Sequence, residues 1–283
     1  MTPPDPGASR RVHAILNPDR PFTLMGVVNV TPDSFFDGGR YFAPGDAIAR
    51  GLELRSEGAD WVDVGGESTR PGSEPVSPGE EAARVVPVVA GLVSQGVAVS
   101  VDTRNVETAR GALDAGATLV NDVTGLADPA MAALAADRGA AVLLMHMQGS
   151  PKTMQNAPTY ADVVAEVRAF LEDRLHAAEA RGIPRERLAV DPGIGFGKAL
   201  EHNLRLIAGL RALCDLGVPV AVGVSRKSFL GVVTGASPTD RLAGSLAAAV
   251  CAFQNGARIF RVHDVKATRD ALATSEAVRS HGT

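Results

Sequence analysis

Short apolar runs alternate with longer amphipathic stretches along most of the chain. Each run is rich in Val, Leu, Ile and Ala, and a polar or Gly-rich turn separates it from the next Ala-rich stretch of helical spacing. Continuous apolar runs are typical of parallel strands that helices cover. The pattern therefore predicts eight βα units, with strands at Leu24–Val30, Trp61–Val64, Ala98–Val101, Thr118–Asn121, Ala141–Met145, Leu188–Val190, Val220–Val222 and Arg258–Val262.

Two architectures share this pattern, an open doubly wound sheet and a closed barrel. Eight strands, together with the absence of a GxGxxG sequence after the first strand, favour a sheet that right-handed crossovers close into a TIM (β/α)8 barrel. The chain has 283 residues, and such a barrel needs roughly 250. We therefore predict a single α/β barrel domain over residues 22–283. A flexible lead-in rich in Pro, Asp and Arg precedes it over residues 1–21.

Composition narrows the classes of partner. The net charge is −4, from 28 basic and 32 acidic residues, so neither a nucleic acid nor a membrane surface is expected as a partner. No run approaches the ~20 apolar residues of a membrane span, and we expect a cytoplasmic location. Cys214 and Cys251 form no CxxC pair, and the pattern around each predicts a buried apolar filler rather than a redox or zinc site.

Polar clusters follow nearly every predicted strand. Asp102 and Asn121 stand at the ends of two neighbouring strands, Asp191 follows another, and Arg261 and His263 fall on or after the last one. A single Asp at such a point is often a helix cap, and that explanation serves equally for Asp102 or Asp122 taken alone. Because the C-terminal strand ends of a barrel converge, polar groups at all eight ends instead predict a site for a polar or charged small molecule.

The polar segments resemble the signature segments of dihydropteroate synthases, a family of pterin-binding TIM barrels. The resemblance covers about residues 22–280 and keeps the order of all the segments. It rests on NVTPDSF at residues 29–35, GGESTRPG at 65–72, NDV at 121–123, DPGIGF at 191–196, SRKSFLG at 225–231 and RVHD at 261–264.

The resemblance implies an enzyme that joins (7,8-dihydropterin-6-yl)methyl diphosphate to p-aminobenzoate and releases pyrophosphate. Carboxylates, a side-chain amide and a lysine match the donors and acceptors of a pterin ring, and an arginine stacks on its face. The implied catalytic residues are Asp102, Asp191, Lys227 and Arg261. The implied pterin diphosphate contacts are Thr69, Asp102, Asn121, Asp191, Phe196, Lys227, Arg261 and His263.

The same resemblance implies a magnesium ion and a second substrate site. Asn29 corresponds to the family's Mg²⁺ ligand, and a single amide oxygen suits a cation that keeps several waters. His263 could instead be an ordinary strand-end histidine, but its position two residues after Arg261 puts both on one strand face. The implied p-aminobenzoate contacts are Phe35, Asp37, Thr69, Arg70, Lys227 and Ser228.

Three alternatives stay open at this point. A methyltetrahydrofolate-binding methyltransferase barrel shares the Asp and Asn contacts but binds no diphosphate. A degenerate, inactive relative should show broken motifs, whereas the motifs here are complete. Phe36 stands where most members have a small residue, which leaves room for a sulfonamide-insensitive variant. The family resemblance also implies a homodimer through helices in the C-terminal half.

Overall fold

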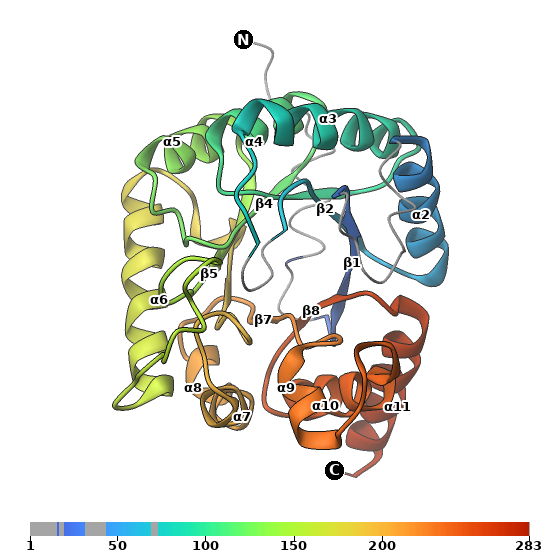
Figure 1. The fold of residues 1–283 in the computed structure, drawn as a ribbon, viewed down its shortest axis with the longest axis vertical. Coiled ribbons are helices and arrows are strands. Elements are labelled where there is room, and N and C mark those ends of the chain that lie inside the picture. The colour runs from blue at the N-terminus through green and yellow to red at the C-terminus, as the bar shows by residue number, and fades with distance from the viewer. Residues whose placement is uncertain (1–15, 17–19, 32–43, 69–72, 283) are drawn as a thin grey trace.

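The computed structural model describes residues 16, 20–31, 44–68 and 73–282. Eight parallel strands form one sheet in the order β6-β5-β4-β3-β2-β1-β8-β7. An isolated parallel bridge between Val190 and Val220 joins its two ends. The helices lie in a ring around the strands (Figure 1). The predicted TIM barrel is therefore confirmed.

Each predicted run overlaps one observed strand. The strands are β1 Thr23–Asn29, β2 Trp61–Gly65, β3 Val99–Asp102, β4 Leu119–Asp122, β5 Ala141–Met145, β6 Leu188–Asp191, β7 Ala221–Val222 and β8 Ile259–Val262. The helices are α2 Pro44–Glu57, α3 Pro78–Ser94, α4 Val106–Asp114, α5 Pro129–Arg138, α6 Val163–Ala180, α7 Leu200–Ala208, α8 Arg211–Cys214, α9 Ser228–Thr234, α10 Leu242–Gln254 and α11 Val265–His281.

The inside of the barrel is apolar at one level and polar at the next. One buried cluster collects apolar side chains from around the sheet, namely Leu16, Met25, Trp61, Leu119, Ala141, Leu143, Ala189, Ala221 and Ile259. Side chains two positions apart on a strand share a face. The next inward residues toward the C-terminal ends therefore include Asp63 after Trp61, Asn121 after Leu119, Asp191 after Ala189 and Arg261 after Ile259. A polar layer thus rests on an apolar one.

The structure bears on two expectations from the sequence, for the lead-in and for the cysteines. Leu16, inside the predicted lead-in, is buried in the interior cluster, while residues 1–15 and 17–19 lie outside the described residues. The prediction that both cysteines are buried fillers was wrong for Cys251, which is exposed, and Cys214 is only partly buried. Cys251 lies on the outward face of α10, where an apolar pattern alone does not distinguish the two faces. Within the described residues, no helix is both long and apolar enough to cross a membrane.

A glycine-rich loop follows β6 and lies against the segment that follows β5. Gly193 and Gly197 both have a positive φ, at 68° and 61°. A Cβ atom on Gly193 would overlap the carbonyl oxygen of His146, and one on Gly197 would overlap that of Gln148. Only glycine fits these two positions, so the loop holds a close approach between two backbones.

We predict that Gly193→Ala lowers the free energy of unfolding by more than about 3 kcal/mol, since backbone strain and a clash with a carbonyl add. Gly182→Ala is the matched control, because Gly182 also has a positive φ of 87° but open space around it. Its cost should be about 1 kcal/mol, from strain alone. Chemical denaturation measures both values. Equal costs for the two variants would contradict the predicted close approach.

Candidate active site

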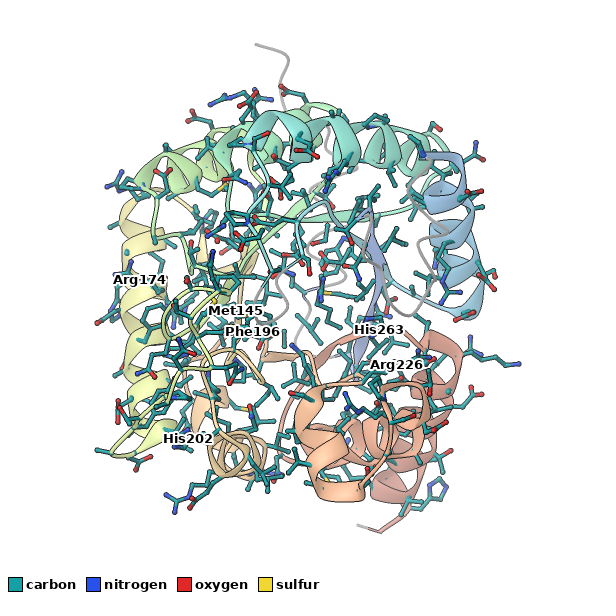
Figure 2. The ribbon with its side chains drawn as sticks, in the orientation of Figure 1. Met145, Arg174, Phe196, His202, Arg226 and His263 are labelled. Atoms are coloured by element: carbon teal, nitrogen blue, oxygen red, sulfur yellow. The ribbon has the colours of Figure 1, made fainter. Side chains whose placement is uncertain are left out.

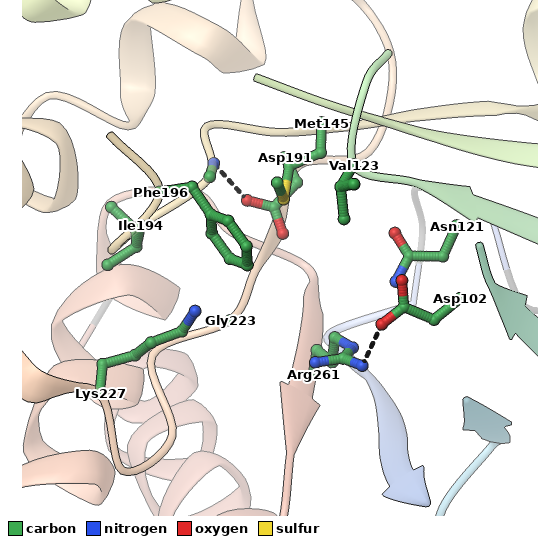
Figure 3. A pocket seen from close by; sticks show the side chains of 11 residues that line it. Asp102, Asn121, Val123, Met145, Asp191, Ile194, Phe196, Gly223, Lys227 and Arg261 are labelled. Atoms are coloured by element: carbon green, nitrogen blue, oxygen red, sulfur yellow. Dashed lines mark hydrogen bonds and ion pairs between the residues drawn. The ribbon is translucent and has the colours of Figure 1, made fainter. Parts of the chain in front are cut away.

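A pocket opens at the C-terminal ends of the strands and encloses about 330 Å³, part of it open to solvent. Figure 3 shows side chains from opposite walls converging on it. Six of the residues predicted to bind pterin diphosphate line it, namely Asp102, Asn121, Asp191, Phe196, Lys227 and Arg261. The polar layer of the barrel interior therefore forms the floor of a pocket.

Arg261 links the carboxylates of two strands at the centre of the barrel. Its Nε donates to Asp63 Oδ2 at 2.5 Å, and its second terminal nitrogen donates to Asp102 Oδ2 at 2.6 Å. Asn121 Nδ2 donates to the same Asp63 oxygen at 3.2 Å. Burial disfavours the charge on Arg261, but Asp63 and Asp102 outweigh it and raise the pKa of the guanidinium. The guanidinium plane is therefore fixed by two strands before any ligand arrives.

The two carboxylates of the pocket hold protons more tightly than usual. Burial raises the pKa of Asp102 to about 7, against the lowering effect of Arg261, and Asp63 raises it further. Burial also raises the pKa of Asp191 to about 6, although a hydrogen bond from the Gly193 N–H, at 2.6 Å, lowers it. Both carboxylates consequently change charge near neutral pH, and each accepts hydrogen bonds best in its ionised form.

Lys227 faces this pair from the opposite wall. Its Nζ lies 4.0 Å from the centre of the Phe196 ring, which is cation–π range. Burial, followed by repulsion from Arg261, lowers the pKa of Lys227 to about 8. The lysine is therefore a cation held between an aromatic face and two carboxylates.

The residue before Lys227 sets its direction. Arg226 has a φ of 55°, which is uncommon for a residue other than glycine. Two hydrogen bonds from its guanidinium to Asp264, at 2.9 and 2.6 Å, and one from its main-chain N–H to Ser245 Oγ, at 2.8 Å, hold it there. Figure 2 shows Arg226 close to His263.

Two predicted binding residues lie near the pocket without lining it. The Nδ1 atom of His263 lies 3.1 Å from Ser225 Oγ. Burial, then repulsion from Arg261, lowers the pKa of His263 to about 3, so the ring is neutral at neutral pH. Ser228 is the first residue of α9 and is exposed. The remaining predicted contacts lie outside the described residues: Phe35, Asp37, Thr69 and Arg70, and with them Phe36.

Asn29 fits the chemistry of a magnesium ligand. It ends β1 and is partly exposed beside Gly65 of β2. Among the described residues, no group of three or more His, Cys, Asp or Glu could hold a metal ion by itself. A metal here would thus be held by one amide oxygen, with waters and diphosphate oxygens as its other ligands, a set that Mg²⁺ accepts.

Sequence reasoning missed one charged residue and the apolar part of the pocket wall. Asp63 is fully buried and stands inside an apolar strand. An isolated charge in an apolar run indicates a buried ion pair, so the sequence did contain a signal for this residue. Val123, Met145 and Ile194 also line the pocket, but nothing in the sequence separates them from core residues.

The helix-cap explanation fails for both Asp122 and Asp102, because Asp128 caps α5, the helix that follows β4. Asp122 accepts hydrogen bonds from the Thr124 N–H at 2.8 Å and the Leu126 N–H at 3.0 Å, so it shapes its own loop. Asp102 instead accepts from Arg261 and lines the pocket. Asp122 is therefore structural, whereas Asp102 belongs to the site.

We predict that Asp63→Asn lowers the free energy of unfolding by about 3–5 kcal/mol, because it leaves Arg261 with one buried partner in place of two. Pterin affinity should fall with it, since the acceptor that Asn121 and Arg261 share loses its negative charge and holds both side chains less firmly. Asp114→Asn is the control: Asp114 pairs with Arg138 on the surface, where loss of an ion pair costs less than about 1 kcal/mol. Denaturation and calorimetry measure the two effects. An Asp63→Asn protein as stable as the control would exclude the proposed bridging role.

Comparison with known proteins agrees with the geometry. The family described as pterin binding enzyme matches residues 25–263. The dihydropteroate synthase of Escherichia coli strain K12 is 47% identical over 258 residues, covering 91% of this chain and 92% of that protein.

Two solved structures extend the likeness to the fold. The Yersinia pestis dihydropteroate synthase in complex with a sulfonamide drug has a TM-score of 0.89 and 45% identity, covering 92% of this chain and 94% of that chain. The Xanthomonas albilineans dihydropteroate synthase in complex with 7,8-dihydropteroate has a TM-score of 0.84 and 48% identity, covering 93% and 95%. The chain therefore belongs to the pterin-binding enzyme family and, within it, to the dihydropteroate synthases.

Proposed function

We propose that the protein is a transferase that condenses (7,8-dihydropterin-6-yl)methyl diphosphate with p-aminobenzoate to give 7,8-dihydropteroate and pyrophosphate. The observation that carries the proposal is the convergence of Asp102, Asn121, Asp191, Lys227 and Arg261 on one pocket. The Xanthomonas relative binds 7,8-dihydropteroate, which contains both the pterin and the p-aminobenzoate halves. A cytoplasmic location is proposed with it, on the likeness to these synthases.

The likeness to synthases over nine tenths of the chain favours this reaction over a methyltransferase barrel. Against an inactive relative, the charged residues that line the pocket are all present, and hydrogen bonds join Arg261 to Asp102 and to the buried Asp63. A purely structural barrel gains nothing from charges buried in this way, because burying them costs free energy.

The flat pterin ring fits between the two walls of the pocket. Asp102 and Asp191 accept hydrogen bonds from ring N–H groups, and Asn121 supplies both a donor and an acceptor. Lys227 donates to a ring oxygen or nitrogen, and the fixed guanidinium of Arg261 lies against the ring face. Val123, Met145 and Ile194 exclude water from the ring edges.

The reaction breaks the carbon–oxygen bond to the diphosphate and forms a carbon–nitrogen bond. The electron pair of the broken bond leaves with the diphosphate oxygen, and positive charge develops on the methylene carbon and spreads into the pterin. Asp102 and Asp191 are placed to stabilise this charge, because their buried carboxylates act in a site of low dielectric. The amine of p-aminobenzoate then attacks the carbon, and the proton that its nitrogen loses passes to solvent.

The leaving diphosphate needs positive charge and N–H donors. Arg261 supplies charge, and His263 supplies the N–H of a neutral ring. Mg²⁺, when bound at Asn29, neutralises charge on the diphosphate oxygens. Thr69 is the further diphosphate contact that the family resemblance implies.

The p-aminobenzoate site is proposed from the resemblance, with Phe35, Asp37, Thr69, Arg70, Lys227 and Ser228 as its contacts. Sulfonamides mimic this substrate, and the Yersinia relative has been solved with such a drug. We propose the same sensitivity here. Phe36 is the residue whose bulk could reverse it.

We also propose a homodimer through α9 and α10. Both helices expose apolar side chains: Val232 is 68% exposed, Val233 57% and Leu242 40%. Ala247 and Cys251 continue this exposed face along α10. A contiguous apolar face of this kind is a common feature of subunit interfaces.

The proposed activity predicts pyrophosphate release only when the pterin diphosphate and p-aminobenzoate are both present. Asp102→Asn should lower kcat at least 100-fold while the protein stays folded, because a charge that stabilises the transition state is lost. Asp114→Asn, on the exposed end of α4, should keep full activity. Absence of pyrophosphate release from the unmodified protein would reject the reaction, and full activity of Asp102→Asn would remove Asp102 from the site.

The proposed dimer predicts a mass of twice 29.3 kDa in solution, measured by light scattering during size-exclusion chromatography. Ala247→Arg places a charge on the exposed face of α10 and should give a monomer. Ala133→Arg makes the same change on the exposed face of α5, across the barrel in Figure 1, and should leave the dimer intact. A monomeric parent protein, or a dimeric Ala247→Arg variant, would argue against this interface.

A further inference from the structure

A buried lysine stands behind the pocket wall, outside the residues assigned so far. Lys198 follows the glycine-rich loop and is only 2% exposed. Its Nζ lies 2.9 Å from His146 Nδ1, 2.9 Å from the Phe196 carbonyl oxygen and 3.4 Å from the His146 carbonyl oxygen. Neither Lys198 nor His146 lines the pocket, so neither can contact a ligand there directly.

These contacts match a charged ammonium group. A protonated lysine has three N–H donors and no acceptor, and Lys198 has three partners. The two carbonyl oxygens can only accept, which leaves His146 Nδ1 to accept the third bond through its lone pair. The pKa of His146 is lowered to about 3, by burial and then by Lys198, so its ring is neutral and free to take that role. The geometry therefore assigns the proton on the His146 ring to Nε2.

The charge of Lys198 acts on Asp191. Burial lowers the pKa of Lys198 to about 7, and attraction by the Asp191 carboxylate opposes this lowering. Asp191 in turn faces three cations from three elements: Lys227 before α9, Lys198 before α7 and Arg261 on β8. Of these, Lys227 and Arg261 line the pocket, whereas Lys198 stays behind the wall.

Lys198 also ties the pocket wall together. Its bond to the Phe196 carbonyl and its two contacts with His146 join the β6–α7 loop to the end of β5. The same loop carries the Phe196 ring that faces Lys227 and the Gly193 N–H that donates to Asp191. One side chain thus fastens the loop and also places a positive charge near Asp191.

We propose that Lys198 is a positioning residue for pterin binding: its ammonium group fastens the Phe196 loop to His146 and supplies the buried positive charge that keeps Asp191 ionised. The inference deepens the proposed function and rests on it for the identity of the ligand.

The two parts of this role have different signatures. Loss of the fastening lowers pterin affinity equally at every pH. Loss of the charge makes Asp191 hold its proton more tightly, because Lys198 is one of the cations that lower its pKa. The acid limb of the affinity–pH profile then moves to higher pH, by about one unit. The alkaline limb stays in place, because Lys198, with a pKa of about 7, has already lost its charge at the pH where Lys227 titrates.

The first test measures binding of 6-hydroxymethylpterin by calorimetry between pH 5 and pH 9. Lys198→Met removes the charge, and Lys152→Met is the matched control, since Lys152 lies on the surface with a side chain 61% exposed. The proposal expects the acid limb to shift upward in Lys198→Met with the alkaline limb unmoved, and neither limb to shift in Lys152→Met. The ligand's own titration is common to all proteins and cancels in the comparison.

A double variant identifies the group through which the charge acts. In an Asp191→Asn background, adding Lys198→Met should shift the acid limb no further. A folded Lys198→Met protein whose acid limb does not move, or a full further shift of the acid limb in the double variant, would overturn the proposal.

The second test needs no variant, so it decides the matter if Lys198→Met does not fold. The chain has six histidines, and ¹⁵N spectra of labelled imidazole rings distinguish a nitrogen that carries a proton from one that accepts a hydrogen bond. The proposal requires His146 to be an Nε2–H tautomer from pH 5 to pH 7. An Nδ1–H tautomer would require a neutral Lys198 and would refute it.

Neither test depends on turnover. A protein that binds pterin with the predicted shifts but releases no pyrophosphate would reject the proposed reaction and retain this inference. An active enzyme whose affinity–pH profile keeps its acid limb unmoved in Lys198→Met would support the proposed reaction and reject this inference.

Discussion

The site depends on one partly buried cation, Arg261, which is paired with buried carboxylates from two other strands. Arg261 on β8 is held by Asp63 on β2 and Asp102 on β3, and Asn121 on β4 donates to the same Asp63 oxygen. Buried charges cost several kcal/mol each unless they are closely paired. The arrangement therefore depends on the close pairing of its members, and it fixes the floor of the pocket across four strands, β8, β2, β3 and β4.

The apolar layer beneath makes this arrangement possible. Trp61 and Ile259 lie one inward step below Asp63 and Arg261, and both are essentially fully buried. They pack with seven other apolar side chains beneath the charged layer, which keeps water away from that side of it. The low dielectric that raises the pKa of Asp102 and Asp191 is a consequence of that packing.

The sequence predicted the barrel and half of the pocket for one physical reason. A parallel strand shows its core face as an apolar run, and its C-terminal end shows as the first polar residue, so Asp102, Asn121 and Asp191 could be placed in advance. Met145 and Val123 could not, because an apolar side chain facing a ligand looks like one facing the core.

Charges inside elements were harder to interpret than charges at their ends. Asp63 was passed over because it interrupts a strand, although an unpaired charge in an apolar run requires a partner. Asp122, next to Asn121, has the sequence position of a site residue but bonds its own loop. The distinction lies in which neighbour each carboxylate meets, and sequence position alone does not contain it. Cys251 shows the same limit on a helix, where apolar spacing did not reveal which face of α10 is covered.

The glycines of the β6–α7 loop also bear on how inhibitors of this pocket would fare under selection. Gly193 and Gly197 leave no room for any side chain, and a Cβ on Gly195 would come within 3.2 Å of the Lys227 side chain. A compound that presses against this stretch of backbone meets a surface that point mutation cannot reshape without destabilising the fold. Drug escape would have to arise elsewhere in the pocket, at positions where bulk can change and the barrel can still assemble.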